Sequence, residues 1–269
     1  MMLKTFEGAQ VLVTGASEGI GFEIARLAAE AGACVLMVAR DEQKLRAAAA
    51  RIQGKRRPDV ASVDLSDAVA LDGLLSRLDR NAFVPDLVVN NAGHGASGAL
   101  DEADWQKLDV MFRLNMIALA RITHWAIMRM RSRRRGSIVN LSAAVATRPT
   151  PYFAAYAATK AFVTNLSMAA NAELKGSGLS VSAVHPPIVK TTFADADKAD
   201  LRSTLVVKLF PAVSATAVAR AVLRVARNGR RSVVVGPIAS IVMASAMLMP
   251  RTLDLPFMSL LFKGKRAEP

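Results

Sequence analysis

The sequence predicts one α/β domain, in which a doubly wound parallel sheet is covered by helices on both faces, followed by an apolar helical extension. Two observations carry this prediction. Short runs rich in β-branched residues alternate with helical patterns from residue 10 to residue 237, as is typical of parallel sheets. The 269 residues also contain no repeat of solenoid period and no low-complexity linker. We therefore expect one domain over residues 1–236 and the extension over 237–269.

The expected strands are short apolar runs, and the expected helices repeat apolar residues at three- and four-residue spacing. In chain order the strands are QVLVTG (10–15), CVLMVA (34–39), DVASVD (59–64), DLVVNNAG (86–93), GSIVNLS (136–142), LSVSAVHPP (179–187) and SVVVGP (232–237). The helices are expected at 21–32, 41–54, 68–80, 105–128, 152–176 and 215–229.

The formal net charge is +13, and its densest cluster is RMRSRRRG at residues 129–136. Basic residues are favoured at a helix C-terminus, so we interpret the cluster as a solvated helix end. The sequence has no zinc-finger spacing, no aromatic-interleaved basic sheet and no helix-turn-helix pattern. We expect no nucleic-acid partner and assign no metal site. The single cysteine, Cys34, and an N-terminus without a secretory pattern favour a cytoplasmic location.

The stretch TGASEGIG, residues 14–21, follows the first strand and opens the first helix. Glycine permits a tight turn and lets a pyrophosphate approach backbone N–H groups at a helix N-terminus. A tight strand-to-helix turn without a ligand explains the same residues, so this motif alone leaves both interpretations open.

Arg40 closes the second strand, where the adenosine ribose of a dinucleotide lies in such a fold. An arginine there suits a 2′-phosphate, whereas an acidic residue would bind a free 2′-hydroxyl. We therefore expect NADP(H) in preference to NAD(H). Glu18 and Asp41 lie nearby and oppose this preference.

Tyr156 and Lys160 are four residues apart in a predicted helix and share one face. An ammonium next to a phenol favours the phenolate, which lowers a pKa that is normally about 10. This pair therefore predicts a tuned proton donor.

Together these pieces resemble the short-chain dehydrogenase/reductase family over residues 7–236. The resemblance rests on TGASEGIG, NNAG (90–93), Asn115 within FRLNMIAL, YAATK (156–160) and HPPIVKT (185–191) in the family's order. It implies a Rossmann-type sheet, a bound nicotinamide dinucleotide, hydride transfer between a carbonyl and an alcohol, and a homodimer or homotetramer. It also implies a lid at about 192–212.

Carried over residue by residue, the resemblance makes Tyr156 the general acid or base and Lys160 its partner on the nicotinamide ribose. Asn115 would support a proton-relay water. The implied cofactor-binding residues are Gly15, Ser17, Glu18, Gly19, Ile20, Gly21, Arg40, Asp64, Leu65, Asn91, Ala92, Gly93, Tyr156, Lys160, Pro186, Val189 and Thr191.

The sequence departs from this family at the serine that donates a hydrogen bond to the substrate oxygen. Counting from Gly136, from Tyr156 and from Asn115 places that position at Ala143. Ser142 is adjacent and substitutes only if the strand bulges or shifts, because neighbours on a strand point to opposite faces. Otherwise the substrate or another side chain supplies the bond, or the chain is a weakly active or non-catalytic dinucleotide-binding regulatory or scaffold protein.

The extension contains an apolar run from Ile238 to Met249 between two prolines, followed by LPFMSLLF and basic residues. The run is shorter than the about 20 residues that span a bilayer. Packing on protein and peripheral attachment to a membrane surface both explain it. In either case, the apolar tail favours a hydrophobic, lipid-like ketone or alcohol as substrate.

Overall fold

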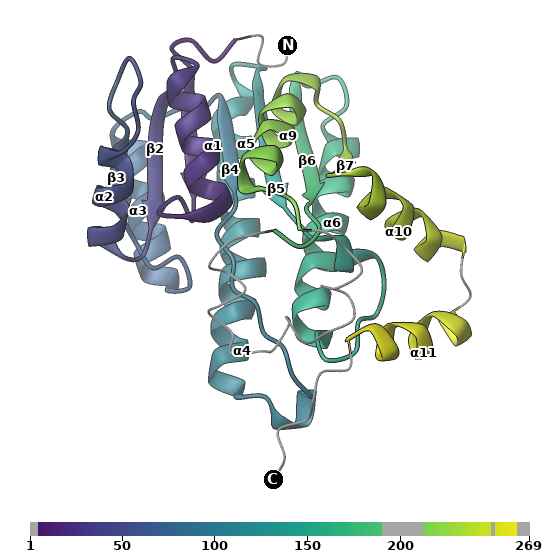
Figure 1. Ribbon diagram of the computed structural model, residues 1–269. Coiled ribbons are helices and arrows are strands. Elements are labelled where there is room, and N and C mark those ends of the chain that lie inside the picture. The colour runs from purple at the N-terminus through teal and green to yellow at the C-terminus, as the bar shows by residue number, and fades with distance from the viewer. Residues whose placement is uncertain (1–4, 190–211, 249–250, 263–269) are drawn as a thin grey trace.

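A computed structural model of the chain describes residues 5–189, 212–248 and 251–262. Seven parallel strands form one sheet in the order β3-β2-β1-β4-β5-β6-β7 (Figure 1). Their bounds are Gln10–Thr14 (β1), Cys34–Ala39 (β2), Asp59–Ser62 (β3), Leu87–Asn90 (β4), Gly136–Leu141 (β5), Leu179–His185 (β6) and Ser232–Val234 (β7). The predicted parallel, doubly wound sheet is therefore confirmed.

The two faces of the sheet are buried under different helices, because successive side chains of a strand point to opposite faces. In β1, Val11 and Val13 face one core cluster and Leu12 faces the other. Helices α1 (Gly19–Glu30), α2 (Glu42–Ala50) and α9 (Ala215–Asn228) cover the first face, and α1 and α9 lie in front in Figure 1. The opposite face is covered by α3 (Ala68–Arg80), α5 (Leu119–Arg131) and α6 (Ala154–Glu173).

Short polar side chains cap the beginnings of several helices at the carboxyl edge of the sheet. Asp41, Asp67 and Ser214 cap α2, α3 and α9 by accepting backbone N–H groups of the first turn. Asp104 does the same for α4 (Trp105–Phe112). The connections include the 3₁₀ turns η1 (Leu100–Glu102) and η3 (Ala144–Thr147).

The predicted helix at 105–128 is interrupted by a π-helical segment. Helix α4 passes into η2 (Arg113–Ala118), which is π-helical, and then into α5. π-helical turns inside a helix frequently mark functional sites, because the extra residue shifts the side chains that follow. Here the turn contains Asn115.

The basic cluster after α5 is tied to carboxylates. Arg133 and Arg135 both reach the buried Asp86, whose second oxygen accepts the backbone N–H of Gln10. Arg129 pairs with Asp79 of α3. These contacts attach the α5–β5 connection to the amino edge of the sheet. The cluster therefore forms ion pairs, whereas the sequence predicted only a solvated helix end.

The C-terminal extension forms two helices, α10 (Pro237–Leu248) and α11 (Arg251–Phe262). In Figure 1, α10 leaves the sheet beside β7 and α11 lies below α6. Among the described residues no helix is both long and apolar enough to cross a membrane. The boundary at 236/237 stays a prediction, and the predicted lid lies outside the described residues except for residue 212.

Candidate active site

The predicted site residues gather at the carboxyl edge of the sheet. All strands are parallel, so the turns after β1, β2, β4, β5 and β6 meet along this edge. The strand order reverses between β1 and β4, which are hydrogen-bonded neighbours in the sheet. In open α/β sheets such a switch point leaves a crevice in which ligands bind.

The glycine turn after β1 has room for no side chain at two of its positions. Gly15 has φ +63°, and a Cβ there would lie 2.8 Å from Cα of Ala92. A Cβ on Gly21 would overlap the carbonyl oxygen of Gly15. The glycines are therefore required by the close approach of the two turns, whether or not a ligand is bound.

The N-terminus of α1 also fits a pyrophosphate. Glu18 precedes the helix but makes no side-chain cap, and the first turn holds no acidic residue. The N–H groups at Gly19 and Gly21 therefore lack the side-chain cap that the aspartate- and serine-capped helices have, and such groups bind phosphate well. The carboxylate of Glu18 is exposed, while Ser17 and Ile20 are half-buried beside it.

The sequence analysis did not predict a role for Thr14, which joins the turn after β1 to the turn after β4. Its Oγ1 accepts the backbone N–H groups of Asn91 and Ala92, both at 3.0 Å. The Asn91 amide in turn donates to the carbonyls of Thr14 and Gly15, also at 3.0 Å. The described contacts of Asn91 thus brace the glycine turn, and its backbone borders the crevice.

At the end predicted for the adenosine, Arg40 is exposed and its Nη1 lies 3.8 Å from Oδ2 of Asp64. Asp64 Oδ1 accepts from Ser66 at 2.6 Å and 2.9 Å, and Leu65 is buried beside it. Asp41 caps α2 through its bond from the Lys44 N–H. Asp41 therefore opposes a phosphate near Arg40 less than its position in the sequence suggested.

At the end predicted for the nicotinamide, four predicted residues converge. A Cβ on Gly93 would lie 3.2 Å from Oδ1 of Asn115 and 3.4 Å from Nζ of Lys160. Nζ of Lys160 lies 5.7 Å from the centroid of the Tyr156 ring and donates to the carbonyl of Leu141 at 2.9 Å. Burial lowers the pKa of Lys160 to about 8.

The π-helical turn is held by the side chain of Asn115. Its Nδ2 donates to the carbonyl of His94 at 2.8 Å and to Oγ1 of Thr159 at 3.1 Å. Its Oδ1 accepts the backbone N–H of His94 at 2.9 Å. Asn115 therefore locks the turn after β4 to α6; its role in a proton relay stays a prediction.

A buried polar network lies directly under this corner and was also missed. Asn90 donates to Oδ1 of Asn140 at 2.8 Å and to Thr123 at 3.1 Å, and Asn140 donates to Ser167 at 2.9 Å. Buried amides need such partners. The sequence offered one signal, because an asparagine ends or nearly ends two largely apolar strands.

The geometry opposes Ser142 as a replacement for the missing serine. Its hydroxyl bonds to the carbonyl of Lys160 at 2.9 Å and to Thr164 at 2.8 Å, on the α6 side of the sheet. No bulge intervenes: the N–H of Ser142 bonds to Val184, and that of Ala144 bonds to Pro186. The alternation of strand side chains therefore continues, and Ala143 takes the opposite face to Ser142.

After β6, the turn that follows the strand lies beside Ala143. His185 is fully buried, bonds to Ser232 at 2.9 Å and has its pKa lowered by burial. Pro186 accepts the N–H of Ala144, and Val189 pairs with Val213. Thr191, the last predicted cofactor residue, lies outside the described residues.

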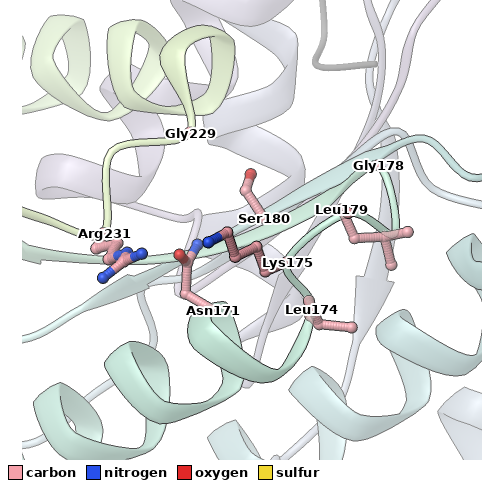
Figure 2. Close-up of a pocket in the computed structure, with 9 residues that line it drawn as sticks. Asn171, Leu174, Lys175, Gly178, Leu179, Ser180, Gly229 and Arg231 are labelled. Carbon is pink, nitrogen blue, oxygen red and sulfur yellow. The ribbon is translucent and has the colours of Figure 1, made fainter.

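A hollow of about 280 Å³ lies at the amino edge of the sheet, away from the predicted site. The residues that bound it include Asn171, Lys175, Ser180 and Arg231 (Figure 2). Ser180 is at the amino end of β6, whereas the predicted site begins after the carboxyl end of that strand. None of the predicted site residues lines this hollow.

The buried ammonium of Lys160 predicts a pH-dependent cost to stability. Below about pH 8 both folded and unfolded states hold the proton, so the folded state bears the full cost of burying the charge. Between this pKa and the unfolded value the folded state loses its proton first, and the cost fades. Lys160→Met should therefore raise the free energy of unfolding by roughly 2–3 kcal/mol at pH 7, and by less at about pH 9.5.

Urea unfolding of the ligand-free protein at both pH values measures this difference. The exposed Lys107 supplies the control, since Lys107→Met should give no gain that depends on pH. An equal gain for Lys160→Met at both pH values would contradict the burial of a charged ammonium.

The chain also resembles known proteins in sequence and in fold. The short chain dehydrogenase family matches residues 9–202. A fatty acyl-CoA reductase of Acinetobacter baylyi is 30% identical over 191 residues, which are 70% of this chain and 65% of that protein. A very-long-chain 3-oxoacyl-CoA reductase of Laccaria bicolor is 32% identical over 199 residues, 72% of this chain and 58% of that protein. The chain thus spans less than two thirds of these relatives.

Two solved structures match nearly the whole chain. A short-chain dehydrogenase from Sphingobium yanoikuyae in complex with NADPH is 28% identical with a TM-score of 0.79, covering 97% of this chain and 99% of the other. A bulky-bulky ketone specific alcohol dehydrogenase from Comamonas testosteroni is 27% identical with a TM-score of 0.75, covering 97% and 96%. With its sheet order, glycine turn and paired Tyr156 and Lys160, this chain belongs to the short-chain dehydrogenase family of oxidoreductases.

Proposed function

We propose that the chain interconverts a hydrophobic ketone and its secondary alcohol with NADP(H). The observation that carries this proposal is the convergence of Lys160, Tyr156, Asn115 and Gly93 at the end of a crevice that begins at an uncapped helix N-terminus. This arrangement supports a proton donor at one end and a phosphate-binding turn at the other. A nicotinamide dinucleotide fits that spacing of functions and, when bound, supplies or accepts the hydride.

The proton is handled by the side chains of this corner. In reduction, the Tyr156 phenol gives its proton to the carbonyl oxygen as the carbon is reduced; in oxidation, the phenolate removes the proton of the alcohol. The Lys160 ammonium stabilises the phenolate, and its bond to the Leu141 carbonyl holds it on the Tyr156 side of α6. Asn115 keeps the turn at His94 in place beside them.

The missing serine makes Tyr156 carry more of the reaction. Ala143 has no donor, and loss of one oxyanion-type donor costs roughly 10²–10³ in turnover. Tyr156 remains able both to bind the carbonyl oxygen and to protonate it. The protein is therefore expected to be a reductase that uses the same chemistry as relatives with the serine but turns over more slowly.

Turnover of Tyr156 and Ala143 variants tests this mechanism. Tyr156→Phe should lower NADPH oxidation with hydrophobic ketones by about 10²–10⁴ because it removes the acid. Ala143→Ser should leave turnover unchanged or raise it, because it returns a donor to the position. Equal turnover in Tyr156→Phe and the parent would refute the assigned acid.

A second candidate is a dinucleotide-binding regulatory or scaffold protein with little turnover, and Ala143 is the observation that favours it. It predicts tight NADPH binding with no oxidation on any ketone. In that case Ala143→Ser would be the informative variant, since gained turnover would identify the serine as the missing part.

The preference for NADP(H) rests on Arg40, which is exposed at the adenosine end, and on Asp41 being occupied as a helix cap. The related Sphingobium yanoikuyae structure is a complex with NADPH. Of the acidic groups near this end, Glu18, Asp41 and Asp64, the one that pairs with Arg40 is Asp64.

Arg40→Ala should weaken NADPH binding about tenfold or more, with NADH binding changed far less, because only NADPH has the 2′-phosphate. Fluorescence titration measures both constants. Arg46→Ala is the control, because Arg46 is an exposed arginine of α2 paired with Glu42. Equal losses for the two cofactors would refute the role of Arg40.

The assembly and the tail complete the proposal. Exposed Trp105, Ile117, Phe162 and Met168 lie over α4, η2 and α6, and a second copy of the chain covering this face would give the homodimer or homotetramer. We place the protein in the cytoplasm, with the exposed leucines of α11 contacting membrane lipid peripherally. Light scattering should then give a mass at least twice that of one chain, and a monomer would refute the proposed assembly. The protein should also co-sediment with anionic vesicles, and a protein that stays in the supernatant would refute the proposed membrane contact.

A further inference from the structure

The outer face of helix α9 carries a line of exposed arginines. The inward residues of this helix are apolar and buried, and the long side chains on its exposed face are all arginines. Arg220, Arg224 and Arg227 follow one another at spacings of four and three residues, so they lie along one face of the helix. Arg230 and Arg231 continue the exposed run after the helix ends. These residues are called the arginine strip below.

The arginine strip differs from other helical arginines of this protein in having no acidic partner. Several exposed arginines elsewhere pair with a carboxylate on the same helix or a neighbouring one, as in the pairs Arg26–Glu23, Arg46–Glu42, Arg113–Asp109 and Arg121–Asp72. Helix α9 contains no acidic residue. Within residues 5–189, 212–248 and 251–262, no member of the strip forms an ion pair.

The needs of the helix itself do not explain the strip. Like charges four residues apart on a helix repel each other, so Arg220 and Arg224 lower the stability of α9. The macrodipole favours cations in the last turn of a helix, which accounts for Arg227 alone. Glu23 of α1, the helix that packs on α9, is already bonded to Arg26. The strip therefore presents charge that the described part of the chain leaves uncompensated.

An uncharged helix follows the strip along the chain. After Arg231 the chain forms β7 and then α10, whose 12 residues include no charged side chain. Ile241 of α10 is 69% exposed. In Figure 1, α9 lies in front of the sheet and α10 leaves the sheet beside β7, the last strand of that half. The β7 half of the molecule thus presents both cationic and uncharged apolar surface.

An anionic bilayer surface matches this combination of surfaces better than other partners. Anionic headgroups attract basic segments, and apolar side chains beside such segments enter the interface. A second copy of the chain would bring two arginine strips together across a symmetric contact, where like charges repel. Nucleic acid would match the charge, but its phosphates offer no contact to an uncharged helix with an exposed isoleucine.

We propose that the arginine strip is the electrostatic docking surface of this protein for an anionic membrane, with α10 beside it at the lipid interface. This docking rests on the membrane contact of the proposed function, and it assigns the charge-dependent part of that contact to α9 rather than to α11. Helix α9 also begins near the crevice, because Val213 pairs with Val189 and donates its N–H to the carbonyl of Ile188. Docking through α9 therefore keeps one end of the crevice close to the bilayer, where a lipid-like ketone is concentrated.

The test measures binding of the full chain to vesicles of phosphatidylcholine mixed with phosphatidylglycerol, and to vesicles of phosphatidylcholine alone. The double variant Arg220→Gln/Arg224→Gln removes two charges from the strip. It should weaken binding to the anionic vesicles about 25-fold, since each basic residue near such a surface contributes about fivefold. Binding to the neutral vesicles should be weak and the same in the variant and the parent.

Two further double variants serve as controls. Arg46→Gln/Arg121→Gln lowers the net charge by the same amount at exposed arginines of α2 and α5. It should weaken binding about twofold or less, because charges more than a Debye length from the lipid are screened. Arg220→Lys/Arg224→Lys keeps the charge of the strip and should retain the parent's affinity, which separates loss of charge from misfolding. High salt should remove the difference between the strip variant and the parent.

The outcomes separate the docking surface from the rest of the proposed function. Unchanged binding in Arg220→Gln/Arg224→Gln, or equal losses in this variant and the Arg46 and Arg121 control, would overturn the arginine strip and leave the α11 contact standing. A smaller mass of the strip variant in light scattering would overturn it in favour of a second copy of the chain. Tighter binding of the parent to duplex DNA than to anionic vesicles would overturn it in favour of nucleic acid.

The reaction is read separately from the docking. NADPH oxidation with a hydrophobic ketone, measured without vesicles, should be the same in Arg220→Gln/Arg224→Gln and in the parent, because neither arginine lies in the candidate active site. A parent that binds anionic vesicles through the strip but oxidises no NADPH would leave the docking surface standing and overturn the proposed reaction.

Discussion

The candidate site is organised around one constraint, the burial of the Lys160 ammonium. Almost no water reaches this group, so the chain must supply its partner, and it does so with the Leu141 carbonyl at the end of β5. The same burial lowers its pKa to about 8, so the group is still mostly protonated at neutral pH and its charge is sensitive to neighbouring groups.

The rest of the carboxyl edge is built so that this lysine has fixed neighbours. Asn115 holds the turn at His94 to α6 from inside a π-helical turn, and Asn90, Asn140 and Ser167 form a buried chain of bonds beneath. Buried networks of this kind favour one arrangement, because any displacement costs the amides hydrogen bonds that water cannot replace. At the other end of the crevice, Thr14 and Asn91 do the same for the glycine turn.

Ala143 shows how the surroundings limit what one substitution can do. The neighbouring serine is already bonded to α6, and the strand continues without a bulge past it. The hydroxyl of Ser142 therefore lies on the opposite face of the strand from Ala143. Under the proposed function, the phenol of Tyr156 would therefore both bind and protonate the carbonyl oxygen.

Periodicity and turn chemistry in the sequence determined the parallel sheet, its two helical layers and the helix positions, because period-two and period-3.6 patterns are local properties of the chain. The spacing of Tyr156 and Lys160 on one helix face, and the glycines at the β1 turn, were set by the same local rules. Only the tertiary structure decided where Ser142 points, that Thr14 and Asn91 brace the glycine turn, and that Arg148 meets Asp254 across 106 residues of chain. Those outcomes depend on long-range packing between segments, and packing is a property that no window of neighbouring residues contains.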